Sequence, residues 1–183
     1  MNRVDGEYTT ITEVKRSKFI SYLVPIERYK ELKERLQEDN PKASHIIYAI
    51  RYLNEFNQIV ENSTDDGEPK GCAGVPALNV LRGKDLINSA LLIVRYFGGI
   101  KLGRGGMIRA YALATKDVID ISNIVEYQEQ IEYIFNTSYS NIEKTNHTLK
   151  KLNITSIERE FNIDSVEWKV YGTREQIDKM MAR

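Results

Sequence analysis

Glycine is concentrated in one part of this 183-residue chain: nine of its eleven glycines lie between Gly67 and Gly106. Most of them fall in two short blocks, residues 65–74 (DDGEPKGCAG) and residues 95–106 (RYFGGIKLGRGG). Glycine is costly inside regular elements and is kept where the backbone turns sharply or approaches another group closely. Because both blocks are also charged, we expect two tight loops that together form a surface for a partner.

Charges of opposite sign are separated along the chain, although the formal net charge is zero. Residues 53–69 contain five acidic and no basic side chains, whereas residues 70–109 contain seven basic side chains and one acidic one. A neutral total argues against a general polyanion binder. The basic middle of the chain can nevertheless attract an anionic partner over roughly 8–10 Å at moderate salt.

The composition indicates a cytoplasmic protein without a membrane partner. The longest apolar run, residues 90–94, is far too short to span a membrane, and the N-terminal residues lack the apolar core of a secretory signal. Cys72 is the only cysteine, so an internal disulfide is excluded.

Hydrophobic periodicity predicts an α+β protein of two domains, residues 1–126 and 127–183. In the first domain we expect a long loop over residues 54–74, and a buried, central strand over residues 89–97. The other elements expected there are strands at 8–14, 18–24 and 44–53, and helices at 27–39, 75–82 and 105–121.

The second domain is predicted to have the order strand, helix, strand, strand, helix. This is the ferredoxin-like order without its last strand. The patterns Ser140–Glu143 and Thr173–Gln176 predict capping boxes at the starts of its two helices. Its elements are expected at 129–137, 141–152, 154–161, 165–171 and from 174 onward.

The second glycine block follows a predicted strand and precedes a predicted helix, which is a favourable place to bind an anion. Unpaired backbone N–H groups and the positive end of the helix dipole point outward at such a helix start. We therefore predict an anion- or nucleic-acid-binding site in which Tyr96 or Phe97 stacks a base. The alternative is a tight turn whose glycines relieve steric strain, with both aromatic side chains in the core. The predicted binding residues are Lys70, Arg82, Arg95, Tyr96, Lys101, Gly103, Arg104, Gly105, Gly106 and Arg109.

The acidic block offers a second chemical interpretation. Asp65, Asp66 and Glu68 are candidates for metal binding or acid–base work, but their spacing is not that of a calcium loop. The alternatives are a solvated turn, or a loop that folds back on Arg95 or Arg104.

No catalytic residue, metal site or cofactor is predicted from the remaining motifs. His45 and Cys72 have no suitable partners for a zinc site or a Cys–His pair. The second glycine block lacks the lysine of a P-loop and the G-x-G-x-x-G pattern of a dinucleotide site.

Three blocks of the sequence resemble the IMPACT/YigZ family in their order and approximate spacing. They are Ala43-x-His45-x-Ile47-Tyr48-Ala49-x-Arg51, Asp65-Asp66-Gly67-Glu68-Pro69, and Arg95-Tyr96-Phe97-Gly98-Gly99-x-x-Leu102-Gly103. Two positions depart from the usual family pattern: Cys72, where many bacterial relatives have threonine, and Arg104, where a small residue is common. The resemblance assigns His45, Asp65, Asp66, Gly67, Glu68, Gly98 and Gly99 to family motifs.

The resemblance implies an N-terminal fold like the second domain of small-subunit ribosomal protein five. It implies a C-terminal ferredoxin-like fold similar to the fifth domain of elongation factor G, here without its last strand. Eukaryotic relatives regulate translation by competing for a co-activator of an initiation-factor kinase, and a nucleic-acid or ribosome role of bacterial relatives is inferred chiefly from their fold.

Our first hypothesis is therefore a non-enzymatic regulator of translation or of a stress response. It would bind RNA, the ribosome or a translation-related protein through the basic glycine-rich loop. The alternative is a hydrolase or transferase that holds a phosphate ligand in this loop and uses Asp66 or Glu68. A third interpretation is protein–protein interaction through the acidic loop.

Overall fold

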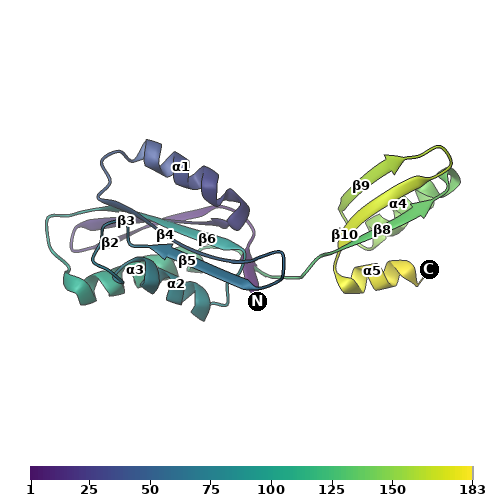
Figure 1. The fold of residues 1–183 in the computed structure, drawn as a ribbon. Coiled ribbons are helices and arrows are strands. Elements are labelled where there is room, and N and C mark those ends of the chain that lie inside the picture. The colour runs from purple at the N-terminus through teal and green to yellow at the C-terminus, as the bar shows by residue number, and fades with distance from the viewer. Residues whose placement is uncertain (183) are drawn as a thin grey trace. The chain divides into compact units, whose positions relative to one another are not determined.

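The computed structural model describes residues 1–182, which divide into two compact units, residues 1–127 and residues from 128 onward. The boundary lies one residue beyond the one expected from the sequence. Both units combine antiparallel sheets with helices, which confirms the mixed helix and strand content (Figure 1). Among the described residues, no helix is both long enough and apolar enough to cross a membrane.

The first unit is built on a five-stranded antiparallel sheet with strand order β2-β3-β6-β4-β5. The central strand β6 is buried along its whole length except at its last residue, Tyr96, as expected for the most apolar segment. The strands are β2 (Tyr8–Val14), β3 (Ser17–Pro25), β4 (His45–Leu53), β5 (Ile59–Thr64) and β6 (Ser89–Tyr96). A separate two-stranded ladder pairs β1 (Asn2–Val4) with β7 (Ile124–Glu126).

Helices cover both faces of this sheet (Figure 1). One face carries α1 (Tyr29–Asp39), which follows the short 3₁₀ turn η1 (Ile26–Arg28), and the other carries α2 (Gly74–Gly83) and α3 (Gly103–Asp120). Alternation along β6 divides the core, because successive side chains of a strand point to opposite faces. Leu91 and Ile93 pack on the α2–α3 side, whereas Leu92 and Val94 pack on the α1 side.

The expected loop over residues 54–74 is only partly correct, because Ile59–Thr64 forms strand β5 and pairs with β4. The Asn54 side chain accepts hydrogen bonds from the backbone N–H groups of Phe56 and Gln58 and closes the hairpin turn. β5 is an edge strand without a fully buried residue, so its sequence is polar and lacks the apolar alternation of the other strands.

The second unit folds as β8 (Ile131–Thr137), η2 (Tyr139–Asn141), α4 (Ile142–Lys151), β9 (Ser156–Phe161), β10 (Val166–Gly172) and α5 (Arg174–Met181). Its three strands form an antiparallel sheet in the order β8-β10-β9 around the fully buried Trp168. The capping box of Thr173 and Gln176 is confirmed at α5. The box predicted at Ser140 is wrong, because Ser140 lies inside η2 and α4 begins after Asn141 without a side-chain cap.

Gly98 allows the chain after β6 to cross the β2–β3 turn at very short range. A Cβ atom at Gly98 would lie 2.0 Å from the carbonyl carbon of Arg16 and 2.4 Å from the backbone nitrogen of Ser17. We therefore expect Gly98→Ala to lower the free energy of unfolding by about 1–3 kcal/mol, measured by chemical denaturation.

Gly105→Ala is the matched control. A Cβ atom at Gly105 would meet only Arg109 Nη1, at 3.5 Å, and the residue lies in the first turn of α3. Alanine should be neutral there or stabilising by up to about 1 kcal/mol. Equal effects of the two substitutions would contradict the close approach as the reason for glycine at position 98.

Candidate functional site

The loop between β5 and α2 is organised by the carboxylate of Asp65. One oxygen of Asp65 accepts hydrogen bonds from the backbone N–H groups of Ala73 and Gly74 at 3.0 and 2.9 Å, and the other accepts from Gly71 at 2.8 Å. Burial of Asp65 opposes its ionisation, but these three donors outweigh it and hold its pKa below the usual value. Asp65 therefore fixes the start of α2.

Asp66 ties the same loop to the first residues of β4. Its carboxylate accepts the backbone N–H of Ile46 at 2.6 Å, and its carbonyl oxygen lies 2.7 Å from Nδ1 of His45. Because a carbonyl oxygen only accepts, Nδ1 of His45 carries the hydrogen and Nε2 is left to face elsewhere. Two of the motif blocks found in the sequence thus meet at His45 and Asp66.

Glu68 is buried and forms the centre of a charged network beneath the loop. Its Oε1 atom accepts hydrogen bonds from Arg95 Nη1 and, at 2.7 Å, from the Tyr111 hydroxyl. Burial, with the neighbouring carboxylate, raises the pKa of Tyr111, so the phenol stays a donor. The side chains of Glu68 and Arg95 are only 4% and 6% exposed.

A pocket of about 390 Å³ opens above this network. Its wall is partly apolar and its rim is cationic, and Phe97, which stands at its edge, is 49% exposed. The lining residues come from the start of β4, the acidic loop, the end of β6 and the start of α3. They are His45, Glu68, Pro69, Arg95, Phe97, Lys101, Leu102, Gly103, Arg104 and Met107.

The start of α3 presents free backbone donors beside this pocket. Gly99 and Gly103 have φ angles of +83° and +71°, which side-chain-bearing residues rarely adopt. The helix begins at Gly103, two residues earlier than expected, so Gly105 and Gly106 lie in its first turn. Neither a capping side chain nor an acidic residue satisfies this end of the helix.

Four of the predicted cations remain exposed around the pocket and the first turn of α3. None of them has a carboxylate partner among residues 1–182, and Arg104 reaches across to donate to the Lys70 carbonyl at 3.3 Å. Arg109 Nη1 approaches Gly105. We call these four residues the basic rim: Lys70, Lys101, Arg104 and Arg109.

Three other predicted binding residues are placed differently. Arg95 is buried against Glu68 and is not open to a surface phosphate. Arg82 lies at the C-terminal end of α2, where it pairs with Glu61 of β5 at 2.5 Å. Tyr96 packs on the α1 side of the sheet and donates its hydroxyl to Asn40, so Phe97 is the aromatic side chain that reaches the pocket.

Two basic residues that the sequence reasoning passed over lie next to the glycine block. Lys15 and Arg16 form the exposed turn between β2 and β3, both with positive φ, and the backbone of Arg16 touches Gly98. Among the residues described, neither forms an ion pair with a carboxylate. Adjacent basic residues between two predicted strands were the only available signal, and nothing in the sequence links that turn to Gly98.

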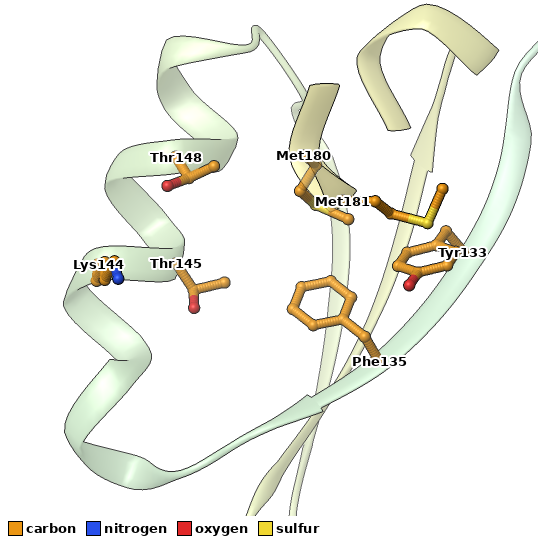
Figure 2. A pocket seen from close by; sticks show the side chains of 7 residues that line it. All are labelled: Tyr133, Phe135, Lys144, Thr145, Thr148, Met180 and Met181. Carbon is orange, nitrogen blue, oxygen red and sulfur yellow. The ribbon is translucent and has the colours of Figure 1, made fainter. Parts of the chain in front are cut away.

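No group of three or more potential ligands among the described His, Cys, Asp and Glu residues is arranged to hold a metal ion. Cys72 is buried. The second unit has its own cavity of about 210 Å³ between α4, α5 and β8, shown in Figure 2. Its lining carries one charged side chain, Lys144, and otherwise Tyr133, Phe135, Thr145, Thr148, Met180 and Met181.

Comparison with known families matches residues 15–119 to the Impact N-terminal domain, which is more than half of the chain. The chain belongs to the IMPACT family. The matched segment contains every residue of the pocket and the strands β3, β4, β5 and β6 of the five-stranded sheet. The family expected from the three sequence blocks is thereby confirmed.

IMPACT family relatives are similar over most of the chain. The IMPACT family member YvyE of Bacillus subtilis (strain 168) is 32% identical over 171 residues, covering 91% of this chain and 76% of YvyE. The IMPACT family member YigZ of Escherichia coli (strain K12) is 33% identical over 136 residues, covering 68% of this chain and 66% of YigZ. The crystal structure of a hypothetical protein aligns over 99% of this chain and 89% of its own length, with 25% identity and a TM-score of 0.72.

Removing Glu68 should destabilise the first unit strongly. Glu68→Ala leaves the Arg95 guanidinium buried without its carboxylate, which costs about 3–5 kcal/mol. Glu13→Ala is the control, because it removes the exposed partner of Lys18 at 3.6 Å and should cost about 0–1 kcal/mol. Both values follow from urea denaturation, and similar small losses for the two variants would contradict a desolvated pair.

Asp65 should make the first unit sensitive to acid. Since its pKa is lowered in the folded state, its contribution to stability is complete above the unfolded-state value of about 3.9 and is lost as the pH falls through the folded-state value. We expect the thermal midpoint to fall below about pH 4, and to fall less steeply in Asp65→Asn. An unchanged acid slope in this variant would exclude Asp65 as a source of the pH dependence.

Proposed function

We propose that this chain is a non-enzymatic regulator of translation that binds single-stranded RNA at the pocket and its basic rim. The observation that carries the proposal is the cationic rim, with free N–H groups of α3, at the mouth of a partly apolar pocket. Cationic side chains and helix N-termini are the groups that proteins direct at phosphates. The β2–β3 turn, with Lys15 and Arg16, extends this surface beyond Gly98.

Single-stranded RNA suits this site better than a duplex. Recognition of an unpaired strand combines a positive track for the backbone with an aromatic platform on which a base stacks. Phe97 supplies the platform, since about half of its surface is exposed and it lines the pocket together with Lys101 and Arg104. A paired base cannot leave its stack to reach such a platform without unpairing.

The link to translation rests on the family. Eukaryotic IMPACT relatives regulate translation. The family resemblance also implies domains like those of ribosomal protein five and elongation factor G, which supports a role at the ribosome by analogy of fold. In this proposal the chain binds RNA that is part of the ribosome or is bound to a translation factor. A cytoplasmic location belongs to this proposal.

The geometry gives less support to a phosphate-binding enzyme that uses the acidic loop. The carboxylate of Asp65 is occupied by three backbone donors, one oxygen of Asp66 by the backbone N–H of Ile46, and one oxygen of Glu68 by Arg95 and Tyr111. Among the described residues, these contacts leave one oxygen of Asp66 and one of Glu68 for a protein partner of the acidic loop. The acidic block acts as a structural anchor, whereas Lys101 and Arg104 of the second glycine block are exposed.

Salt dependence tests the proposal directly. Affinity for a labelled single-stranded RNA should fall linearly on a log–log plot against salt, because each neutralised phosphate releases counterions. Arg104→Ala should weaken binding and reduce the slope by about 0.7, whereas Lys30→Ala, an exposed cation on α1 at the opposite face of the sheet, should change neither. Fluorescence anisotropy at several salt concentrations gives both values.

Equal slopes for Arg104→Ala and the parent protein would remove Arg104 from the interface. Absence of measurable binding at low salt would contradict RNA as the ligand altogether.

A further inference from the structure

One oxygen of the buried Glu68 carboxylate has no hydrogen-bond donor. Oε1 is occupied by Arg95 and Tyr111, whereas Oε2 lies 3.6 Å from His45 Nε2 and accepts no hydrogen bond from the described residues. The side chain of Glu68 is only 4% exposed, and it nevertheless lines the pocket. Glu68 lines the pocket, so this second oxygen is an acceptor that a hydrogen-bond donor of a ligand can reach.

The neighbouring ring nitrogen of His45 is a second acceptor at the same place. Since Nδ1 donates to the Asp66 carbonyl, the neutral ring carries no hydrogen on Nε2. Nε2 and Glu68 Oε2 are therefore two adjacent acceptors at one wall of the pocket. One ligand group that donates two hydrogens from a single nitrogen satisfies both.

We propose that Glu68 Oε2 and His45 Nε2 bind the exocyclic amino group of one nucleobase, so that the pocket prefers cytosine to uracil. The inference rests on the proposed function and specifies which part of the RNA enters the pocket. Cytosine carries an amino group at the position where uracil carries a carbonyl oxygen, and carboxylates read cytosine through this amino group. A uracil oxygen would face two acceptors and would leave both without a donor.

The rest of the pocket selects a nucleotide over a simple amine. Pro69, Leu102 and Met107 give the wall an apolar surface that suits a flat ring, with Phe97 at its edge. Lys101 and Arg104 at the rim repel a free cation but attract the phosphate attached to the same base. A nucleotide fits all three features of the pocket: its amino group meets the two acceptors, its ring meets the apolar wall, and its phosphate meets the cationic rim.

The test compares oligocytidine with oligouridine, each about ten nucleotides long, by fluorescence anisotropy at one salt concentration and neutral pH. The parent protein should bind oligocytidine about tenfold more tightly. Glu68→Gln keeps an oxygen for Arg95 and Tyr111 but turns an NH₂ donor toward the pocket, so the preference should shift toward oligouridine by at least tenfold. A thermal melt checks that this variant is folded.

His45→Asn provides a second variant that leaves the Glu68–Arg95 pair intact. The asparagine amide can donate to the Asp66 carbonyl in place of Nδ1 but supplies no group at the position of Nε2. The preference for oligocytidine should fall to about threefold or less, with little change in affinity for oligouridine.

Equal affinities of the parent protein for both strands would overturn the inference. If Lys101→Ala then weakened both strands equally, the proposed RNA-binding function would stand without the amino-group contact. If neither strand bound at low salt, both the inference and the proposed function would be wrong.

Discussion

The buried ion pair between Glu68 and Arg95 connects the two glycine blocks. Two charges out of water need further hydrogen-bond partners, and Tyr111 of α3 supplies one to Glu68, whereas Arg95 Nε is buried without a partner among the described residues. The pair joins the acidic loop, β6 and α3 at one point, which is the floor of the pocket. The same pair leaves one carboxylate oxygen facing the pocket, so structure and recognition share a single side chain.

A chain without net charge thus presents a local group of exposed cations. Asp65 and Asp66 are held by backbone N–H groups, and Glu68 is paired with Arg95, so contacts within the fold fix the acidic block in place. Lys101 and Arg104 have no such partners within residues 1–182. The separation of charge seen along the sequence thus becomes a local cluster of exposed cations beside the pocket, which net charge does not express.

Local patterns in the sequence predicted most elements, because alternation and helical spacing report which face of each element is buried. They failed at β5, an edge strand whose polar residues do not alternate clearly, and at Ser140, where a 3₁₀ turn displaces the helix start. The anchoring of the acidic loop on Arg95 was foreseen only as one of several alternatives. Arg95 is a buried partner of Glu68 and not a phosphate contact, because long-range packing brings the acidic loop onto the end of β6.

The placement of Tyr96 and Phe97 shows the same limit. Alternation indicated that one of the two faces the core, but only the sheet order shows which face carries α1 and which carries the pocket. The approach of the Lys15–Arg16 turn to Gly98 joins segments about eighty residues apart in the sequence, and no local pattern contains it. Long-range contacts of this kind decide which predicted residues belong to one site.

The central claim is that RNA contacts the pocket and the start of α3. Backbone amide resonances measured by two-dimensional NMR during titration with single-stranded RNA at low salt test it most directly. The account predicts that the largest shifts occur at Gly99, Gly103 and Gly105 and at the neighbouring Phe97, with the amides of α1 unchanged. Shifts centred on α1 or on the second unit, or no shifts at all, would contradict it.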